Sequence, residues 1–286
     1  MAENQLFAVT DQGAVCLGSF AAETSFVAML DGYPLGAYSA LRTFNHNKFL
    51  DLEAHLARTL NSMAIMGKDY NFDEAWFRRA LHQAVSNYPL PNSRLRFDIL
   101  SEAVQRQGFV TQELICLRPF KPTPPRFYKE GVGVDFERSM QRHRPLAKTA
   151  DFAQQREPLA LGYKQDHFER LILDDDGHVL EGMMSNFWAI KAGTVYTAAE
   201  GVLEGVTRKI LLSIIPELDI TLVMEAIRAE EIGTLDEAAM SGSSRALLPV
   251  VRINGQKVGD GAPGPLCRRI LRAYEDYVAR AVRTAV

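Results

Sequence analysis

Two side chains with complementary chemistry, Lys148 and Glu181, lie in the stretch from Arg144 to Asn186. Lys148 ends RPLAK, which we expect to be a short extended segment, and Glu181 lies between two strand-like runs in LILDDDGHVLEGMMSNFWAI. A lysine amine forms an imine with an aldehyde, and an acid keeps a pyridine nitrogen protonated. Pyridoxal phosphate (PLP) chemistry needs both groups, because the protonated ring absorbs the electrons of a carbanion. Taken singly, most lysines are surface charges, and an acid can simply close a hairpin.

Three segments have the chemistry to bind the phosphate of such a cofactor. Gly205–Arg208 (GVTR) opens an expected helix, where free backbone amides and the helix dipole favour an anion and Thr207 adds a hydroxyl. Ser241–Ser244 (SGSS) combines a close-approach glycine with hydroxyl donors, and Arg58 offers a planar donor fork. Each also has a simpler interpretation: a helix cap, a turn and a solvated arginine, respectively.

The composition is that of an ordinary globular protein and excludes several classes of function. The 286 residues are 47% apolar and 23% charged with a formal net charge of −3, so neither a nucleic-acid nor an anionic-membrane surface is indicated. No apolar run approaches the length that spans a bilayer, and MAENQLFAVT lacks the basic-then-apolar pattern of a secretion signal. Cys16, Cys116 and Cys267 form no CxxC pattern, and the six histidines are scattered. We therefore expect a cytoplasmic protein without a metal site.

Residues 1–117 predict a small α+β domain. Its clearest element is an amphipathic helix from Leu52 to Met66, with Asp51 as N-cap and Gly67 as stop. The other expected elements are a hairpin at 5–18, a strand at 34–44, a helix at 72–87, and strands at 94–100 and 109–117. Residues 118–131 hold four prolines, which fix φ and remove backbone donors, so we expect a stiff, non-helical interdomain connector there.

Residues 132–286 predict a larger second domain. Expected strands lie at 132–137, 168–173, 178–180, 185–190, 195–197, 220–224, 237–240 and 247–253, and expected helices at 207–215, 226–232 and 265–284. A further helix should follow Lys148, with Pro158 kinking it or delaying its start. The chain contains no internal repeat, and its length allows two packed domains.

The segment around Glu181 resembles the LLLD-x-DG-x-V-x-EG-x-x-SN-x-F motif of class IV aminotransferases, the fold-type IV PLP-dependent enzymes. Further segments resemble motifs of this family in the same order: GAYSALRTFN, LEAHLARTLNSM, LEGVTRKILL, MSGSSRALLPV and VGDGAPGPLCRRI. The resemblance covers residues 34–280. The family includes branched-chain aminotransferase, D-amino-acid aminotransferase and aminodeoxychorismate lyase. It implies an α+β fold, with a small α/β N-terminal domain and a larger β-barrel-like C-terminal domain with helices.

The resemblance also implies roles for single residues. Lys148 would hold PLP and carry the proton between Cα and C4′, and Glu181 would bind the pyridine nitrogen. The residues that would hold the phosphate are Arg58, Val206, Thr207 and Ser243. Two departures concern the cofactor site: Asp151-Phe152 replaces the family's frequent Asn-Tyr pair after the lysine, and Ser39 stands where glutamate is frequent.

Substrate contacts are implied for Tyr38, Arg94, Arg96 and Ser244. Because side chains alternate along a strand, Arg94, Arg96 and Asp98 share one strand face. Branched-chain enzymes carry a single arginine and a tyrosine near this position. Two arginines indicate an acidic substrate or a paired Arg–Asp site, and a polar face turned outward is a third interpretation.

The function implied is amino transfer from an α-amino acid, with branched-chain substrates as one option, to a 2-oxo acid such as 2-oxoglutarate. The alternative is elimination of the aminodeoxychorismate lyase type, which gives p-aminobenzoate and pyruvate. A member that binds PLP or a partner without turnover is a third option. The family also implies PLP as the cofactor, small-molecule amino acids and oxo acids as partners, and a homodimer.

Overall fold

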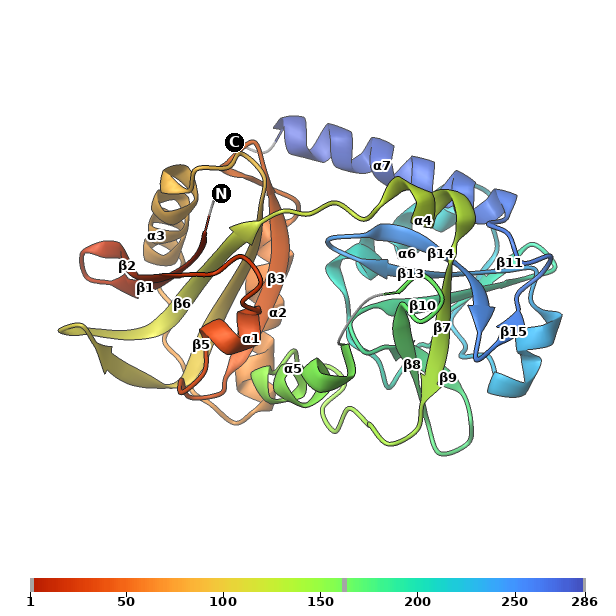
Figure 1. Ribbon diagram of the computed structural model, residues 1–286, viewed down its shortest axis with the longest axis horizontal. Helices are drawn as coiled ribbons and strands as arrows, with labels where there is room; N and C mark the ends of the chain where they lie inside the picture. Colours follow the sequence, from red (N-terminus) through yellow and green to blue (C-terminus); the bar gives the residue numbers. More distant parts are fainter. Residues whose placement is uncertain (1–2, 161–163, 285–286) are drawn as a thin grey trace. The chain divides into compact units, whose positions relative to one another are not determined.

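The computed structural model describes residues 3–160 and 164–284, and the chain divides into two compact units (Figure 1). The first comprises Met1–Lys121, Ala147–Glu157 and Ala281–Val286, and the second comprises Pro122–Leu146 and Pro158–Arg280. The sequence assigned residues 132–286 to the second domain, whereas the segment that carries Lys148 groups with the first unit. The reason is pairing with a strand of that unit: Tyr38 N donates to Lys148 O at 3.0 Å, and Ala150 N donates to Gly36 O at 2.8 Å.

The first unit is built on a six-stranded antiparallel sheet of order β2-β1-β6-β5-β3-β4. Its strands are β1 (Asn4–Thr10), β2 (Gly13–Phe20), β3 (Ala37–Phe44), β4 (Lys48–Phe49), β5 (Ser93–Arg106) and β6 (Phe109–Pro119). Its helices are α1 (Phe26–Met29), α2 (Leu52–Ile65), α3 (Glu74–Asn87) and α5 (Ala150–Arg156). The expected hairpin, strands and two long helices of this region are confirmed.

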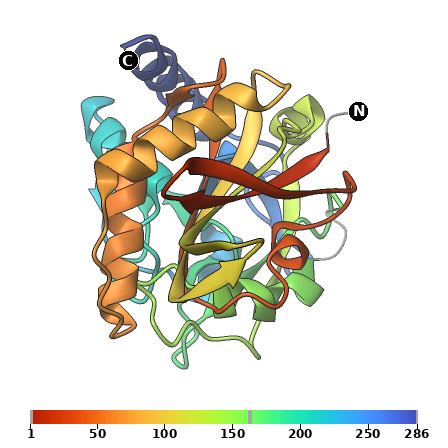
Figure 2. The same ribbon diagram turned by 90° about the vertical axis from the view of Figure 1, so that its left-hand side faces the viewer.

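Helices cover both faces of this sheet (Figure 2). On one face, α2 and α3 pack with Leu56, Phe77 and Leu81 against Phe97 and other sheet residues. On the other face, α1 packs in a separate cluster of buried side chains. Both long helices begin at an aspartate cap: Asp51 accepts from Ala54 N, as expected, and Asp73 accepts from Trp76 N.

The second unit contains a closed six-stranded barrel of order β10-β13-β14-β7-β8-β9, in which β9 pairs with β10 again. The strands of the unit are β7 (Val132–Glu137), β8 (Glu169–Leu173), β9 (Val179–Gly182), β10 (Asn186–Lys191), β11 (Thr194–Tyr196), β12 (Leu222–Val223), β13 (Glu237–Gly242), β14 (Ala246–Ile253) and β15 (Gln256–Lys257). Its helices are α4 (Pro125–Glu130), α6 (Val206–Glu217) and α7 (Pro265–Thr284), with 3-10 turns at Glu157–Ala160 and Ala229–Thr234. Val134, Leu171, Phe187, Met240 and Leu248 belong to its buried core. The predicted α+β fold with a barrel-like larger part is confirmed.

Two local predictions around prolines differ from the structure. Residues 118–131 are not free of helix, because Pro125–Glu130 form α4; proline is tolerated in a first helical turn, where its missing N–H has no helical partner. Pro158 neither kinks α5 nor delays its start. Instead α5 ends at Arg156, and the chain continues as the 3-10 turn that contains Pro158. Within residues 3–160 and 164–284, no helix is both long and apolar enough to cross a membrane.

Candidate active site

The backbone around Lys148 pairs with the start of β3. Its N–H donates to Ser62 Oγ at 3.0 Å, its carbonyl accepts from Tyr38 N at 3.0 Å, and Thr149 forms a bridge with Ala37. The side chain is half-buried, and Nζ lies 4.9 Å from the centroid of the Tyr38 ring. A strand edge and α2 therefore fix the lysine backbone, and its amine lies over an aromatic ring.

Arg58 of α2 contacts the serine that replaces the family's frequent glutamate. Its Nη2 donates to Ser39 Oγ at 2.7 Å, and Ser39 Oγ also lies 3.2 Å from His55 Nδ1. Burial, reinforced by the charges of Arg58 and Lys148, lowers the pKa of His55 well below its ordinary value. His55 is therefore neutral, and the positive charge beside Ser39 belongs to arginine. The family motifs point to the arginine and the serine, whereas the sequence assigns no role to His55.

Arg96 and Asp98 form a buried, two-pronged ion pair on the opposite face of the sheet. Nε donates to Oδ2 at 2.8 Å and Nη2 to Oδ1 at 2.6 Å, and the residues are only 4% and 2% exposed. Burial alone would lower the pKa of Arg96, but the charge and hydrogen bonds of Asp98 raise it above its ordinary value. The interpretation of a polar face turned outward is therefore wrong here, and the paired Arg–Asp interpretation is confirmed.

Tyr38 connects this ion pair to Lys148. Arg96 Cζ lies 4.0 Å from the Tyr38 ring centroid, so one ring contacts both cations, and Tyr38 Oη accepts from Arg156 Nη2 at 2.7 Å. Sequence reasoning missed Arg156, which α5 brings back to β3. Arg94 shares the strand face but lies further along it, half-buried with Cζ 5.8 Å from the Phe26 ring centroid.

The pair that replaces Asn-Tyr lies in the first turn of α5, just after the lysine. Asp151 is exposed in the first helical turn, where the helix dipole favours an acid, and it accepts from Phe152 N at 2.7 Å. Phe152 is buried. Both residues thus have structural contacts within the first unit.

Glu181 lies at the seam where β9 pairs with β10 and closes the barrel, and it is only 2% exposed. Its Oε1 accepts from Arg142 Nε at 2.7 Å, and its Oε2 accepts from Leu203 N at 3.0 Å and Asn186 Nδ2 at 3.2 Å. Three donors therefore fix the orientation of this carboxylate. Arg142 was not predicted; Asn186 belongs to the recognised SN motif, which was the available signal.

Asn186 also fixes the start of α6. Its Nδ2 donates to Leu203 O at 2.8 Å, and a side chain at Gly205 would place Cβ 2.3 Å from its Oδ1, so any larger residue at position 205 would displace the Asn186 amide. Gly205 is the N-cap and no side chain caps the helix, so the first-turn amides at Val206 and Thr207 have no helical partners. The interpretation of Thr207 as the cap is therefore wrong, because Thr207 lies inside the first turn.

Arg208 adds a buried cation to this helix start. It is 5% exposed, its Nη2 donates to Ala198 O at 2.7 Å, and its Nε is buried without a hydrogen-bond partner among the described residues. Burial lowers its pKa, opposed by Glu204 and Glu181. A buried guanidinium N–H without a partner indicates that this end of α6 is suited to an anion.

The SGSS segment comprises the last two residues of β13 and the start of the turn to β14, and it begins beside the same asparagine. Ser241 lies opposite Asn186 in the sheet, is buried, and accepts from Trp188 Nε1 at 2.9 Å. Ser243 and Ser244 are half-buried in the turn that leads to β14. The structure thus brings Glu181, the start of α6 and this turn together around Asn186.

A buried ion pair anchors the far end of the SGSS turn. Arg245 Nη1 contacts Glu169 Oε2 at 2.5 Å, and Glu169 has no exposed side-chain surface. Glu169 Oε1 accepts from Met184 N at 2.7 Å and Ser185 Oγ at 2.9 Å. One carboxylate therefore ties the loop before Asn186 to the turn after β13. Neither charged residue was predicted.

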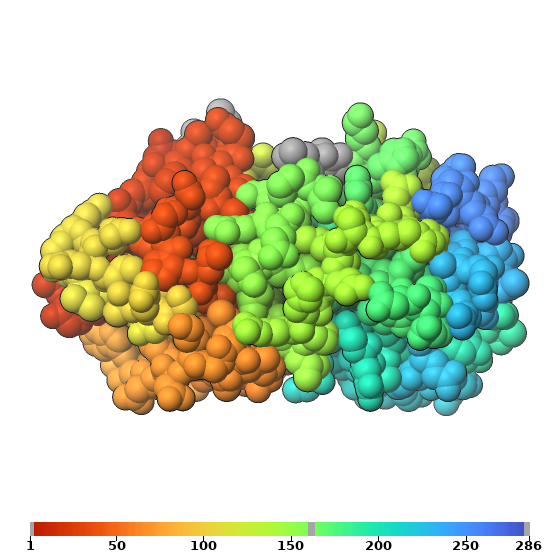
Figure 3. All heavy atoms as spheres, turned by 90° about the horizontal axis from the view of Figure 1, so that it is seen from below, coloured from red at the N-terminus to blue at the C-terminus, as the bar shows by residue number. Residues whose placement is uncertain are grey.

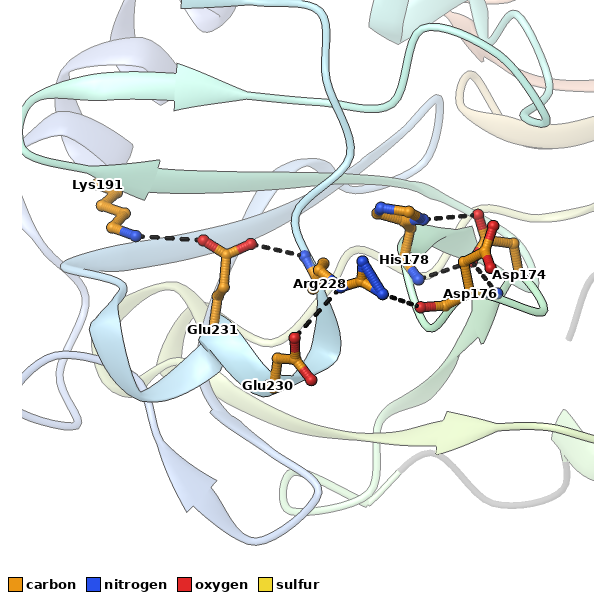
Figure 4. Close-up of polar contacts among 7 residues, drawn as sticks. All are labelled: Asp174, Asp176, His178, Lys191, Arg228, Glu230 and Glu231. Carbon is orange, nitrogen blue, oxygen red and sulfur yellow. Dashed lines mark hydrogen bonds and ion pairs between the residues drawn. The ribbon is translucent and has the colours of Figure 1, made fainter.

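The β8–β9 turn contains a group of possible ligand atoms, which Figure 4 shows. One ligand atom each of Asp174, Asp176 and His178 lies within 4.8 Å of the others. Asp174 accepts from the backbone N–H groups of Asp176 and His178, and its Oδ2 lies 2.9 Å from His178 Nδ1. Burial raises the pKa of Asp174, but these hydrogen bonds outweigh it and lower the pKa. The contacts close the turn and account for the group.

The predicted site residues thus form two groups, one in each unit. The first group contains Tyr38, Arg58, Arg96 and Lys148, with Arg94 further along the sheet. The second contains Glu181, Val206, Thr207, Ser243 and Ser244.

Comparisons with known proteins agree on the class that the fold and these residues indicate. The sequence model of the family described as "Amino-transferase class IV" matches residues 36–253. D-alanine aminotransferase of Bacillus licheniformis is 26% identical over 250 residues, covering 85% of this chain and 87% of that protein. Branched-chain-amino-acid aminotransferase of Pseudomonas aeruginosa is 23% identical over 269 residues, covering 86% and 85%, respectively. In fold, the chain resembles the branched-chain amino acid aminotransferase of Thermoproteus uzoniensis with norvaline, with a TM-score of 0.75 at 22% identity, over 97% of this chain and 96% of that one.

The fold is that of the fold-type IV enzymes, a small sheet-and-helix unit combined with a barrel unit. The chain belongs to the class IV aminotransferases. It is an enzyme of that class, and the expected family and fold are confirmed.

Proposed function

We propose that this protein is a PLP-dependent aminotransferase that moves the amino group of an α-amino acid to a 2-oxo acid, with Lys148 as the lysine that carries the cofactor. The observation that carries the proposal is the link made by Asn186. Its side chain contacts both a buried carboxylate, Glu181, and the carbonyl of Leu203 just before the uncapped start of α6. Those two features match the two ends of a pyridine phosphate, its ring nitrogen and its phosphate.

The residues of the second unit fit this cofactor. A carboxylate has about four lone-pair sites, so the three donors on Glu181 leave room for the N–H of a pyridinium ring. The first-turn amides of α6, including those at Val206 and Thr207, can donate to phosphate. The glycine at 205 leaves room for the Asn186 side chain beside this helix start. Ser243 adds a hydroxyl from the neighbouring turn. Bound PLP would supply an electron sink for the electrons released at the substrate α-carbon.

The first unit supplies the groups that react and orient. The Lys148 amine is the group to hold the aldehyde and to move a proton at the substrate α-carbon. Its backbone is fixed on both sides by Ser62 and Tyr38, so the amine starts from a defined position. Arg58 is a second candidate for phosphate, and we assign Tyr38, Arg94, Arg96 and Ser244 to the substrate.

The lysine assignment is tested by borohydride reduction of the protein reconstituted with PLP. Reduction should fix the cofactor on one peptide, and mass spectrometry should find it on the peptide that contains Lys148. Lys148→Ala should abolish the labelled peptide and the absorbance band of the lysine-bound cofactor, while Lys164→Ala, a surface control in the same half of the chain, should change neither. A label on any other lysine of the wild type rejects the assignment.

The reaction is tested by adding L- and D-amino acids and following conversion of bound cofactor to its amino form. Half-reactions that run to the amino form support transamination. Formation of p-aminobenzoate and pyruvate from aminodeoxychorismate, without half-reactions, would instead favour the lyase.

We also propose a homodimer, which light scattering should show as a mass twice the 31.9 kDa of one chain. A cytoplasmic location is supported by three cysteines that are all free.

A further inference from the structure

A pocket in the first unit lies beside the lysine segment and has a charged floor. Arg96 and Asp98 form its floor, and its lining also includes Leu30, Pro34, Ala150 and Gln154. The walls come from α1 and the chain that leads to β3 on one side and from α5 on the other, and Figures 1 and 3 show these segments next to each other. Ala150 follows Lys148 by two positions, and the Tyr38 ring contacts both Lys148 and Arg96. The pocket is therefore close to the reacting amine.

The floor of this pocket carries no net charge. Arg96 and Asp98 face each other through two hydrogen bonds of 2.8 and 2.6 Å, so one carboxylate balances the guanidinium charge. This fork geometry is the one that guanidinium uses to bind a carboxylate, so Asp98 occupies one donor fork of Arg96, the one made by Nε and Nη2. The guanidinium also lies over the Tyr38 ring, with Arg96 Cζ 4.0 Å from the ring centroid. A second carboxylate would have to displace Asp98 or lie beside it.

Either alternative is unfavourable. Displacement would leave Asp98 buried and charged without its partner, because it is only 2% exposed. Coexistence would put two carboxylates on one guanidinium in a site of low dielectric constant, where like charges repel strongly. The remaining lining is mainly apolar, since six of the other residues are Val27, Leu30, Pro34, Leu35, Leu100 and Ala150.

We infer that Asp98 determines the substrate specificity of this enzyme: by neutralising Arg96, it closes the pocket to a side-chain carboxylate and selects uncharged, mainly apolar side chains. The inference rests on the proposed function, since it takes the pocket as the one that receives the substrate side chain next to Lys148. It favours the paired Arg–Asp site over an acidic substrate, the two interpretations that the pair of arginines indicates. It also departs from the expectation of 2-oxoglutarate, because monocarboxylic oxo acids should be the better amino acceptors.

The test compares half-reactions with leucine, norvaline, glutamate and aspartate, each as both enantiomers. For the wild type, kcat/KM should be at least about tenfold higher for leucine and norvaline than for glutamate and aspartate. A tenfold ratio corresponds to about 1.4 kcal/mol of repulsion between Asp98 and an acidic side chain. Asp98→Asn keeps the shape but removes the negative charge. It should lower this ratio by about tenfold or more, through a gain with the acidic substrates. Asp98→Glu, which keeps the charge, should retain the preference for uncharged substrates.

Glu113→Gln is the matched control. Glu113 lies on the neighbouring strand β6 next to the residue that pairs with Asp98, with its side chain on the opposite face of the sheet near Tyr70. Removing this carboxylate should leave the ratio unchanged. An Asp98→Asn protein that folds, as judged by its melting temperature, and keeps the wild-type ratio overturns the inference, as does a Glu113→Gln protein with the same loss of discrimination.

A binding measurement on the wild type keeps the test independent of the variants. The PLP-loaded protein should bind 4-methylvalerate more tightly than glutarate by about tenfold or more. Equal or tighter binding of glutarate overturns the inference even if every variant at position 98 is insoluble. Failure of the proposed function is a different result: the wild type would then convert no amino acid at all. If the wild type converts acidic and uncharged amino acids at equal rates, only the inference about Asp98 is rejected, and the proposed function stands.

Discussion

Asn186 lies directly opposite Glu181 at the seam that closes the barrel, and its amide donates to both Glu181 Oε2 and Leu203 O. The donor is shared between the carboxylate on β9 and the chain that leads into α6. A strand pairing that closes the barrel therefore also sets the position of the acid relative to a helix start. Removing this amide should affect fold and cofactor site together.

Asn186→Asp tests this relationship. The change keeps the size of the side chain but replaces the shared donor with a second carboxylate next to Glu181. We expect a loss of about 1–3 kcal/mol in the free energy of unfolding, the usual effect of an unmet buried hydrogen bond, with additional repulsion between the acids. PLP affinity of the apo protein, measured by fluorescence titration, should fall by about tenfold or more.

Asn254→Asp is the control for Asn186→Asp, because Asn254 is an exposed turn residue between β14 and β15. It should change neither unfolding nor PLP affinity by a measurable amount. An Asn186→Asp protein with wild-type affinity for PLP would show that Asn186 does not position the site.

The ion pair between Arg142 and Glu181 gives a second prediction. Both side chains are buried, with 6% and 3% exposed, so losing either residue removes a charged contact from a buried partner. Glu181→Gln or Arg142→Met should each cost about 3–5 kcal/mol in the apo protein, and the double variant should cost clearly less than the sum. Urea unfolding without PLP measures the four free energies, because bound cofactor would add its own stabilisation. Additive losses would mean that the two groups do not interact in solution.

How far the sequence predicts this site depends on how local each contact is. Lys148 and Glu181 stand out because each has a rare chemical role and lies in a recognisable segment. The Arg96–Asp98 pair was one of the stated alternatives, because two residues in a strand at a spacing of two necessarily share a face. The burial that decides among those alternatives depends on α1 and α5, which cover the face, and a strand pattern does not contain that information.

Other contacts depend on topology and were not predictable. Glu169 and Arg245 are 76 positions apart in the chain and meet only because the barrel brings β8 and the β13–β14 turn together. Arg142 lies in a loop without periodic pattern and reaches Glu181 across 39 positions. Helix α4 differs from the expectation for a local reason: four prolines indicate a non-helical connector, although Pro125 occupies a first turn, where proline fits.

The Glu169–Arg245 pair provides a third prediction. Arg245→Met should leave the Glu169 carboxylate buried and without its charged partner, at a cost of about 3–5 kcal/mol. Because Glu169 also accepts from Met184 N and Ser185 Oγ, the loop before Asn186 should loosen as well. Amide hydrogen exchange should therefore speed up at residues 183–185 and at the SGSS turn, while α3 in the first unit serves as an internal reference. Unchanged exchange at Met184 would contradict the proposed link between loop and turn.

Stability should depend on pH through His55. Its pKa in the folded protein is lowered by burial and by Arg58 and Lys148, whereas the unfolded chain has the ordinary value near 6.5. Below that value the unfolded state binds a proton at His55 that the folded state does not bind. The stability that neutral His55 gives is therefore fully present above pH ~6.5, and the free energy of unfolding decreases as the pH falls below this value. A proton bound only by the unfolded state lowers the free energy of unfolding by about 1.4 kcal/mol per pH unit.

His55→Gln should reduce the loss of melting temperature between pH 7 and pH 5, relative to the wild type. The exposed control His143→Gln should keep the wild-type dependence of melting temperature on pH. If His55→Gln and the wild type lose stability equally over this range, His55 is protonated in the folded protein and the neutral form inferred for it is wrong.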